Sequence, residues 1–445
     1  MKKNVKNKGK RRVAVQSLDI PEGFLARMRN ELGEEEAEAL KRALESTPSV
    51  SIRLNAARCR PDTRRQLEEM AAGGVEWCAD GLRFEERPDF IIDPLFHAGV
   101  YYVQEAGSMY YQKILEEILP SFMGEINLLD MCAAPGGKTT AMLNALHKSG
   151  RPYNVLANEY DRKRASILVE NIQKWGDPNV IVTNADATSI GRLDDTFDII
   201  AVDAPCSGEG MMRREPIARS QWSPELVAEC STLQKRILED LMPALKPGGV
   251  LIYSTCTFNR EENEQNVDYF SETLGLNLIA GPERFMPHER QCEGLFVAVF
   301  KNASDDEAQT EMPVASLHHV NEEKTVEIAD KIYAVPANLY PLYRQIEKNK
   351  LHILSVGTMI AERKGNVEVP SSRSVLGNKA SNLPYVDLSL EDALNYLRGQ
   401  TLVLTEEIPT GYVAVGFEGY PLGLVKNIGN RANNLYPQEW RIRHR

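Results

Sequence analysis

Two cysteines stand at the ends of strand-like segments, where their thiols could act on a bound ligand. Cys206 follows the apolar run FDIIAVD at 197–203, and Cys256 ends the run GGVLIYSTC at 248–256. A lone cysteine is most often a small core residue. Two cysteines at the ligand-binding edge of one sheet instead favour a role as nucleophile or as a group that handles protons.

Such a pair of thiols suits a reaction at carbon 5 of cytosine, which is a poor nucleophile. A thiolate that adds at carbon 6 turns the ring into an enamine-like species, and carbon 5 can then attack an electrophilic methyl group. The thiol must be ionised, and Lys138 is a candidate cation for lowering its pKa from about 8.5. Asp203 is placed to steady the ring, and a second group must handle the proton that leaves carbon 5. The target base must also be unstacked to reach the pocket. The residues alone leave open which cysteine attacks.

A glycine-rich turn, DMCAAPGGKT at 130–139, forms a second candidate site. Gly136 and Gly137 come where a predicted strand turns into a helix, so the backbone can approach a ligand and helix N–H groups can point at it. A Walker A loop, as in a P-loop NTPase, needs glycine where Cys132 stands. An adenosyl-binding turn needs an acid at the tip of the next strand, and Glu159 stands there at the expected distance of about 20 residues. The chain lacks GxGxxG, which disfavours a dinucleotide oxidoreductase.

Strands and helices alternate between residues 101 and 301, and these elements must position both candidate sites. The predicted strands are 126–130, 155–159, 179–184, 197–203, 248–256 and 295–300. The predicted helices are 104–119, the segment from the glycine turn to 147, 162–175, 225–245 and 261–274. This alternation predicts an α/β domain with a doubly wound, Rossmann-like parallel sheet. Ligands of such sheets bind beyond the carboxyl ends of the strands.

Smaller units flank this central domain. Residues 1–12 form a basic tail without an acid, and residues 13–100 are typical of a small α+β domain. Residues 302–312 are polar, acidic and without periodicity, as in a linker. The remainder is rich in short strands and divides into an α/β-rich module at 313–380 and a β-rich region at 381–445.

The composition excludes several classes of protein. With 445 residues, 42% hydrophobic and 26% charged, the chain matches a globular protein of several domains. No run approaches about 20 apolar residues and no apolar signal core begins the chain, so we expect no membrane partner and a cytoplasmic location. The seven cysteines include no CxxC pair, so we expect free thiols and no metal. A net charge of −11 argues against a general nucleic-acid coating protein.

At these residues the sequence resembles the RsmB/Nop/Sun family of RNA cytosine-C5 methyltransferases, and within it the RsmF branch that modifies small-subunit ribosomal RNA. CAAPGGK together with DAPCSGEG and STCT is a specific combination. The matching segments are HAGVYYVQEAGS at 97–108, LLDMCAAPGGKTT at 128–140, ANEYDRKR at 157–164, VDAPCSGEGMMRR at 202–214 and YSTCTFNREENE at 253–264. The 381–445 region is similar to the PUA-like RNA-binding ending of that branch. The resemblance implies that the 13–100 domain binds RNA as well.

The resemblance implies S-adenosyl-L-methionine as cofactor and assigns roles to residues of this chain. The binding turn would be Cys132, Ala133, Ala134, Pro135, Gly136, Gly137 and Lys138. Glu159 would hold the ribose with Arg164 close by, Asp186 would lie near the adenine, and Asp203 would sit beside the methionine portion or the target base. The family uses the cysteine at 256 as nucleophile and the one at 206 to assist product release.

The implied substrate is cytosine in RNA, as 16S ribosomal RNA within the small ribosomal subunit, with the protein acting as a monomer. Arg213 and Arg214 either contact RNA phosphates or lie in a solvated loop. An RNA-binding or assembly factor with a decayed site is the non-enzymatic alternative. The two intact cysteines argue against that alternative, because a dead site need keep neither.

Overall fold

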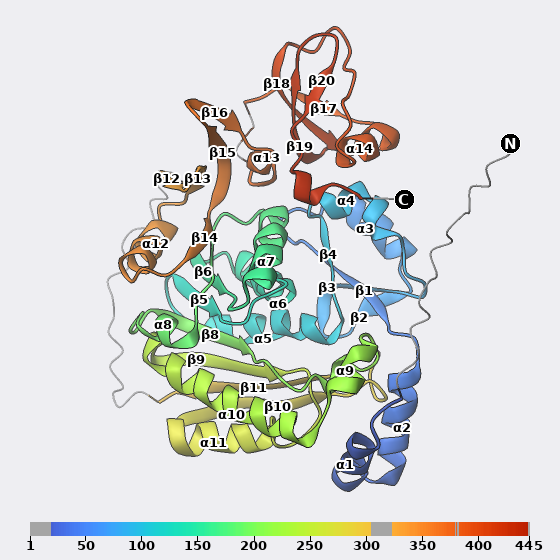
Figure 1. Cartoon of the computed structure of the whole chain (residues 1–445), viewed down its shortest axis with the longest axis vertical. Coiled ribbons are helices and arrows are strands. Elements are labelled where there is room, and N and C mark those ends of the chain that lie inside the picture. Colours follow the sequence, from blue (N-terminus) through green and yellow to red (C-terminus); the bar gives the residue numbers. More distant parts are fainter. Residues whose placement is uncertain (1–18, 304–322, 379, 381, 444–445) are drawn as a thin grey trace, which may run out of the picture.

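An eight-stranded sheet lies at the centre of the computed structural model, which describes residues 19–303, 323–378, 380 and 382–443 (Figure 1). Its strands are, in spatial order, β10 (Leu276–Phe285), β11 (Leu295–Asn302), β9 (Leu245–Thr255), β8 (Phe197–Asp203), β5 (Ile126–Asp130), β6 (Tyr153–Asn158), β7 (Val180–Thr183) and β14 (Ile353–Val356). The five strands from β9 to β7 run parallel, whereas β11 and β14 are antiparallel to their neighbours. The predicted Rossmann-like α/β fold is confirmed, in a mixed rather than an all-parallel form.

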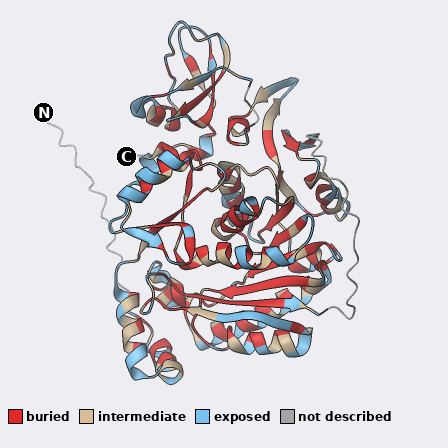
Figure 2. Cartoon of the chain, turned by 180° about the vertical axis from the view of Figure 1, so that it is seen from behind, coloured by how far each residue is buried: buried red, intermediate tan, exposed pale blue. Residues whose placement is uncertain are grey.

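Helices cover both faces of this sheet, and the central strands are buried on both sides (Figure 2). One face packs against α8 (Ala187–Gly191), α10 (Pro224–Leu241), α11 (Glu264–Leu274) and α12 (Leu339–Lys348). The other face packs against α5 (Tyr110–Ile118), α6 (Gly137–Ser149) and α7 (Arg162–Trp175). Strands buried on both faces carry continuous apolar runs, and this is why the sequence pattern located them.

Capping residues fix where the helices beside the site begin and end. Asp161 accepts hydrogen bonds from the backbone N–H groups of Lys163 and Arg164 and starts α7, which ends at Gly176 with φ of 78°. Ser223 caps α10 in the same way. Side-chain acceptors at this position satisfy N–H groups that have no partner within the helix. Local interactions therefore fix where α7 and α10 begin.

Two strands of the central sheet were not assigned to it from the sequence. Most of β10 is solvent-exposed, so its residues lack the alternation that marks a half-buried strand. β14 is short and follows the predicted linker in sequence, yet it pairs with β7 and completes the edge of the sheet. Neither strand has a local sequence signal strong enough to assign it to this sheet.

The N-terminal part contains two packing units. Its sheet has the order β2 (Gly73–Val75), β3 (Cys78–Phe84), β1 (Val50–Leu54) and β4 (Tyr101–Val103), with α3 (Pro61–Met70) and α4 (Pro94–His97) beside it. The helices α1 (Glu22–Leu32) and α2 (Glu34–Glu45) pack against central-domain loops, including α9 (Pro216–Gln221). The sheet extends to residue 103, three residues into the segment assigned to the central domain by sequence, and the basic tail 1–12 lies outside the described residues.

The C-terminal part begins with a four-stranded sheet and ends with a second one. The first has the order β12 (Lys324–Ile328), β13 (Lys331–Val335), β15 (Thr358–Lys364) and β16 (Val367–Pro370). The second contains β17 (Tyr385–Asp387), β18 (Gly411–Phe417), β19 (Tyr420–Asn427) and β20 (Ala432–Asn434), with α13 (Arg373–Leu376) and α14 (Leu390–Leu397). This second unit shares one hydrophobic core with the N-terminal sheet. Most of the predicted linker 302–312 falls in the range that is not described, and no helix within the described ranges is long and apolar enough to cross a membrane.

Candidate active site

The structure brings the two strand-end cysteines together. Strands β8 and β9 are adjacent and parallel, with Asp203 opposite Ser254 in register, so the segments that follow leave the sheet side by side. The sulfur atoms of Cys206 and Cys256 are 3.2 Å apart, and both residues are partly exposed. A ligand at this edge of the sheet can therefore reach either thiol.

The surroundings of Cys206 oppose its ionisation. The hydrogen bond with Cys256 and burial both raise the pKa of Cys206 well above that of an ordinary thiol. Cys206 therefore keeps its proton near neutral pH and can donate it toward the neighbouring sulfur.

A charged side chain from the glycine turn lies beside the pair. Lys138 Nζ donates to Asp203 Oδ2 at 2.7 Å, and both side chains are mostly buried. Burial opposes the charge of Lys138, but the attraction of Asp203, with a smaller contribution from Cys256, leaves the pKa of Lys138 raised. Lys138 therefore carries a positive charge beside the two cysteines.

Two further side chains, which the sequence did not reveal, orient Asp203. Ser254 Oγ donates to Asp203 Oδ1 at 2.7 Å, and the hydroxyl of Tyr111 lies 2.8 Å from Ser254 Oγ. Ser254 stands two residues before Cys256 and could have been found from that position. Tyr111 lies on α5, far away in sequence, and no signal in the sequence marks it.

The glycine turn connects β5 to α6 as the sequence predicted. Gly136 has φ of 110°, and a Cβ there would lie 3.3 Å from Leu168, so the turn requires glycine. No side-chain oxygen caps the N-terminus of α6, which leaves its first N–H groups for a ligand. Thr139 donates to the buried Asp130 at 2.6 Å, and burial raises the pKa of Asp130 to about 7.

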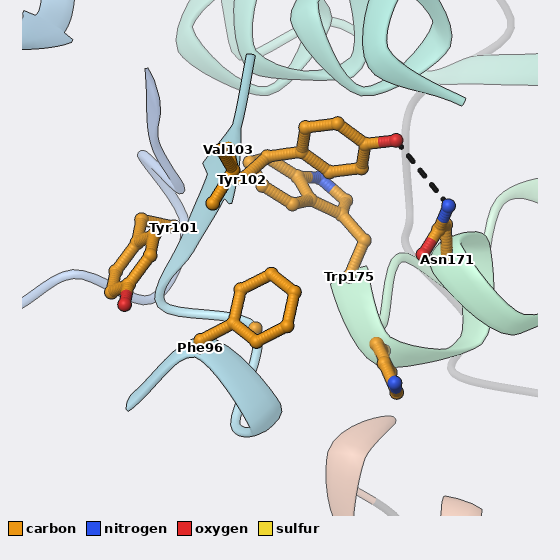
Figure 3. Close-up of a pocket in the computed structure, with 8 residues that line it drawn as sticks. Phe96, Tyr101, Tyr102, Val103, Asn171 and Trp175 are labelled. Atoms are coloured by element: carbon orange, nitrogen blue, oxygen red, sulfur yellow. Dashed lines mark hydrogen bonds between the residues drawn. The ribbon is translucent and has the colours of Figure 1, made fainter. Parts of the chain in front are cut away.

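Neighbouring side chains hold the outer carbonyl groups of this turn. Arg164 donates to the carbonyl of Ala134 at 2.7 Å, and Asn171 donates to that of Pro135 at 2.7 Å. Asn171 also donates to the hydroxyl of Tyr102, at the rim of an aromatic hollow between β4 and α7 (Figure 3). Contacts with α7 and β4 thus fix the outer side of the glycine turn, so the inner side of the turn keeps one shape.

Glu159 lies at the next strand end, and only one of its two carboxylate oxygens has a hydrogen-bond partner among the described residues. Its Oε1 accepts from the N–H of Asp161 at 2.9 Å. Its Oε2 is buried without a hydrogen-bond partner among the described residues and lies 3.6 Å from Arg164 Nη1. A buried unpaired carboxylate oxygen is costly unless a ligand supplies donors. Two adjacent ribose hydroxyl groups fit this requirement.

The remaining predicted residues have mixed surroundings. Asp186 is exposed and accepts from the N–H of Ser189 at 2.7 Å, so it also caps α8. Burial, together with the nearby Asp203, raises the pKa of Cys132, which argues against a role for it as nucleophile. Ala133 lies at the inner end of the turn and is buried.

Arg213 is bound within the protein, which answers the alternative left open by the sequence. It donates to Glu293 at 2.7 Å and to the carbonyl of Cys292 at 2.8 Å, and only 6% of its side chain is exposed. Arg214 contacts the same glutamate at 3.3 Å and is 33% exposed. Arg213 therefore shapes the loop after Cys206, and it is not positioned to contact a phosphate at the surface.

Comparison with known proteins agrees with this geometry. Residues 119–301 match the family model of the 16S rRNA methyltransferase RsmB/F, residues 20–106 match the N-terminal domain of the 16S rRNA methyltransferase RsmF, and residues 384–442 match the methyltransferase RsmF PUA domain. Relatives with the name ribosomal RNA small subunit methyltransferase F include one from Cronobacter sakazakii, 31% identical over 95% of this chain and 96% of its own. Another, from Shewanella loihica, is 29% identical over 82% of this chain and 83% of its own.

Solved structures show the same fold. A methyltransferase homolog protein from Pyrococcus horikoshii is 26% identical, covers 64% of this chain and 96% of its own, and has a TM-score of 0.55. NSun6 from Pyrococcus horikoshii with SFG is 21% identical, covers 65% of this chain and all of its own, and has a TM-score of 0.55.

The fold, the glycine turn and the adjacent acid define an S-adenosylmethionine-dependent methyltransferase, and the resemblance seen in the sequence is confirmed. The chain belongs to the RsmB/F family of 16S rRNA methyltransferases. Membership of this family removes the P-loop NTPase alternative.

Proposed function

We propose that this protein transfers a methyl group from S-adenosyl-L-methionine to carbon 5 of cytosine in 16S ribosomal RNA, with Cys256 as the nucleophile and Cys206 as the group that assists product release. The observation that carries the assignment is the 3.2 Å separation of the two sulfurs beside the Lys138–Asp203 pair. The names of the relatives support the RNA substrate.

The first step forms a bond between Cys256 Sγ and carbon 6 of the ring. The electron pair of the C5–C6 double bond then becomes available at carbon 5, while Asp203 steadies the ring and Lys138 stabilises the charge on the sulfur before attack. The cofactor supplies an electrophilic methyl group next to carbon 5.

The second step removes the carbon-5 proton and breaks the C–S bond. The electron pair of the C5–H bond restores the C5–C6 double bond, and Cys256 leaves as a thiolate. Cys206 is assigned to this step, because its sulfur lies 3.2 Å from the sulfur that departs. Its thiol gives its proton to the departing Cys256 sulfur, and the Cys206 thiolate that this leaves accepts the proton from carbon 5. A thiol with a raised pKa is also suited to holding a proton there.

The cofactor would occupy the turn from Cys132 to Lys138. The uncapped N–H groups of α6 and the unpaired Glu159 Oε2 support this placement, with Glu159 on the ribose hydroxyls and Arg164 next to it. Asp186 would face the adenine with the carboxylate oxygen that does not cap α8. Asp203 would lie between cofactor and base.

The N-terminal and PUA domains would bind RNA around the target, as parts of a monomer that works on the small ribosomal subunit in the cytoplasm. The family matches of both domains support this part of the proposal. The shared core of the two domains further supports it, because it gives RNA a single fixed surface.

The mutation of each cysteine tests the assignment. We expect Cys256→Ala to abolish methyl transfer to small-subunit RNA, measured with labelled cofactor. Cys206→Ala is expected to accumulate a covalent protein–RNA species that survives a denaturing gel. Cys59→Ala, just before α3 in the N-terminal part and away from the pair, is the matched control and is expected to remain active.

Bisulfite sequencing of 16S ribosomal RNA from cells with and without the gene identifies the product. The proposal expects at least one cytosine whose protection disappears with the gene and returns with the wild-type chain, and does not return with Cys256→Ala. Adduct accumulation in Cys256→Ala in place of Cys206→Ala would show that the two roles are exchanged.

A further inference from the structure

A buried carboxylate outside the predicted site holds the segment that follows Cys256. Glu209 lies three residues beyond Cys206 and is fully buried. Its Oε2 accepts three hydrogen bonds, from Thr257 Oγ1 at 2.6 Å, Phe258 N at 2.7 Å and Asn259 N at 2.9 Å. These donors are the three residues directly after Cys256. Its Oε1 accepts from the indole N–H of Trp222 at 2.9 Å.

A second buried carboxylate makes the reciprocal contact. Glu262 lies six residues beyond Cys256, and its Oε2 accepts from the N–H of Ser207, the residue directly after Cys206, at 3.0 Å. The same oxygen accepts from Gln234 at 2.8 Å, and Oε1 accepts from Asn259 Nδ2 at 2.8 Å. Each cysteine segment thus supplies a carboxylate that binds the other segment.

The backbones of the two segments also approach each other directly. The N–H of Gly210 donates to the carbonyl of Cys256 at 2.9 Å, and a Cβ at Gly210 would lie only 2.8 Å from that oxygen. The segments therefore form one layer, with both carboxylates inside it.

Neutral donors alone bind these carboxylates. Within the described ranges neither Glu209 nor Glu262 lies within 4.0 Å of a basic side chain. A buried carboxylate is expensive, but it is acceptor-only and can take several N–H and O–H donors at once. A glutamine cannot replace it, because its NH₂ group would face at least one donor. Such an arrangement holds the two segments at a fixed separation and orientation.

We propose that Glu209 and Glu262 are positioning residues that fix the separation and direction of the two thiols, Glu209 for the attack by Cys256 and Glu262 for product release by Cys206. This inference rests on the proposed function for the roles of the two thiols. The geometric part can be tested without methyl transfer.

A protein-only experiment measures the proximity of the sulfurs. Diamide oxidises two neighbouring thiols to a disulfide, releasing two protons and two electrons that reduce its N=N bond. Mass spectrometry of peptides would follow the Cys206–Cys256 disulfide in the wild-type chain, in Glu209→Gln and in Glu262→Gln. We expect the disulfide to form at least about tenfold more slowly in both variants than in the wild-type chain, because a displacement of about 1 Å changes such rates by about 100-fold. Cross-linking at the wild-type rate in both variants would overturn the proposal.

The activity experiment separates the two roles. In the Cys206→Ala background, Glu209→Gln is expected to slow formation of the covalent RNA adduct by about 100-fold, with unchanged cofactor affinity by calorimetry. With both cysteines present, Glu262→Gln is expected to accumulate adduct that the wild-type chain resolves. Equal loss of adduct formation in both variants would contradict the division of roles.

A control and a milder variant guard against simple unfolding. The control is Glu261→Gln, next to Glu262 in the sequence. The side chain of Glu261 is partly exposed and pairs with Arg27 on α1, so this variant is expected to match the wild-type chain in both assays. Thr257→Val removes one donor to Glu209, together with the contacts of that hydroxyl to Ser207 and Asn259, and leaves the carboxylate in place. If Glu209→Gln does not fold, Thr257→Val must still slow cross-linking at a temperature where this variant is folded. If no adduct forms even in Cys206→Ala, the proposed function fails, while the diamide result still decides the geometric part.

Discussion

The carboxylate of Glu159, at the end of β6, has one oxygen bound to the backbone, whereas the other pairs with Arg164 at 3.6 Å and has no hydrogen-bond partner among the described residues. If Oε2 accepts from ribose, its loss removes a hydrogen bond to a charged group, worth about 1.5–3 kcal/mol. We expect Glu159→Ala to weaken S-adenosylmethionine binding by about 10- to 100-fold in calorimetry and to leave RNA affinity nearly unchanged. Glu170→Gln, on the same helix as Arg164, is the control. Unchanged cofactor affinity in Glu159→Ala would remove Glu159 from the cofactor site.

Residue chemistry explains which of these groups could be predicted. Gly136, Cys206 and Cys256 stand out because few residue types can perform their tasks at a strand end. The sequence did not reveal Glu209 and Glu262, because nothing in the sequence distinguishes a buried glutamate that accepts hydrogen bonds from a glutamate on the surface. Only the fold, which brings Ser207 and Asn259 around Glu262, distinguishes the two cases.

At the scale of elements, the N-terminal helices support the catalytic segment. The ring of Phe24 on α1 is fully buried, 5.8 Å from Trp222 and 6.4 Å from Phe258, two residues after Cys256. The helices α1 and α2 therefore complete the core beneath the nucleophile. Their packing links an element at the beginning of the described chain to the chemistry of β9.

We expect Phe24→Ala to lower the free energy of unfolding by about 3–5 kcal/mol and to reduce kcat as well, because Phe258 loses its support. Phe197→Ala, at the amino end of β8, empties an equally buried position away from the site. It is expected to cost similar stability with little change in kcat at a temperature where both variants are folded. Urea unfolding and labelled methyl transfer measure the two quantities. Equal kcat values in the two variants would show that α1 has no influence on the site.

The elements that sequence reasoning found are those with strong local patterns. β8 is an apolar run between turn residues, and α7 carries both a cap and a terminal glycine. β10 was not predicted, and β14 was predicted only as part of the strand-rich remainder, because partners elsewhere in the chain define the places of both strands in the sheet. The antiparallel pairing of β11 with β9 follows from the extra strand β10, which reverses the chain before β11.

At the scale of the whole molecule, a buried histidine connects the N-terminal part to the C-terminal part. His97 on α4 has Nε2 2.8 Å from the carbonyl of Ile91 and Nδ1 3.3 Å from the hydroxyl of Tyr436. Burial raises the pKa of Tyr436 well above its usual value, so the phenol stays protonated and donates to Nδ1. Burial also lowers the pKa of His97 to about 4. Nδ1 can accept this hydrogen bond only while the imidazole ring of His97 is neutral.

The depressed pKa makes the contact sensitive to acid. Its stabilisation is complete above the unfolded-state pKa of about 6.5 and is lost progressively as the pH falls toward 4, by up to about 3 kcal/mol. We expect the melting temperature of the wild-type chain to fall more steeply between pH 6.5 and 4 than that of His97→Gln. Parallel curves for the two proteins would mean that His97 does not control this acid response.

Strand β14, at the edge of the central sheet, has a consequence for biosynthesis. While the ribosome makes this protein, β7 emerges long before β14, so the hydrogen-bonding groups on its outer edge stay uncovered until about residue 356 has left the exit tunnel. An uncovered edge strand can pair with another chain. A fragment cut at residue 301 would carry that open edge permanently, so the catalytic domain cannot be detached cleanly from the C-terminal part.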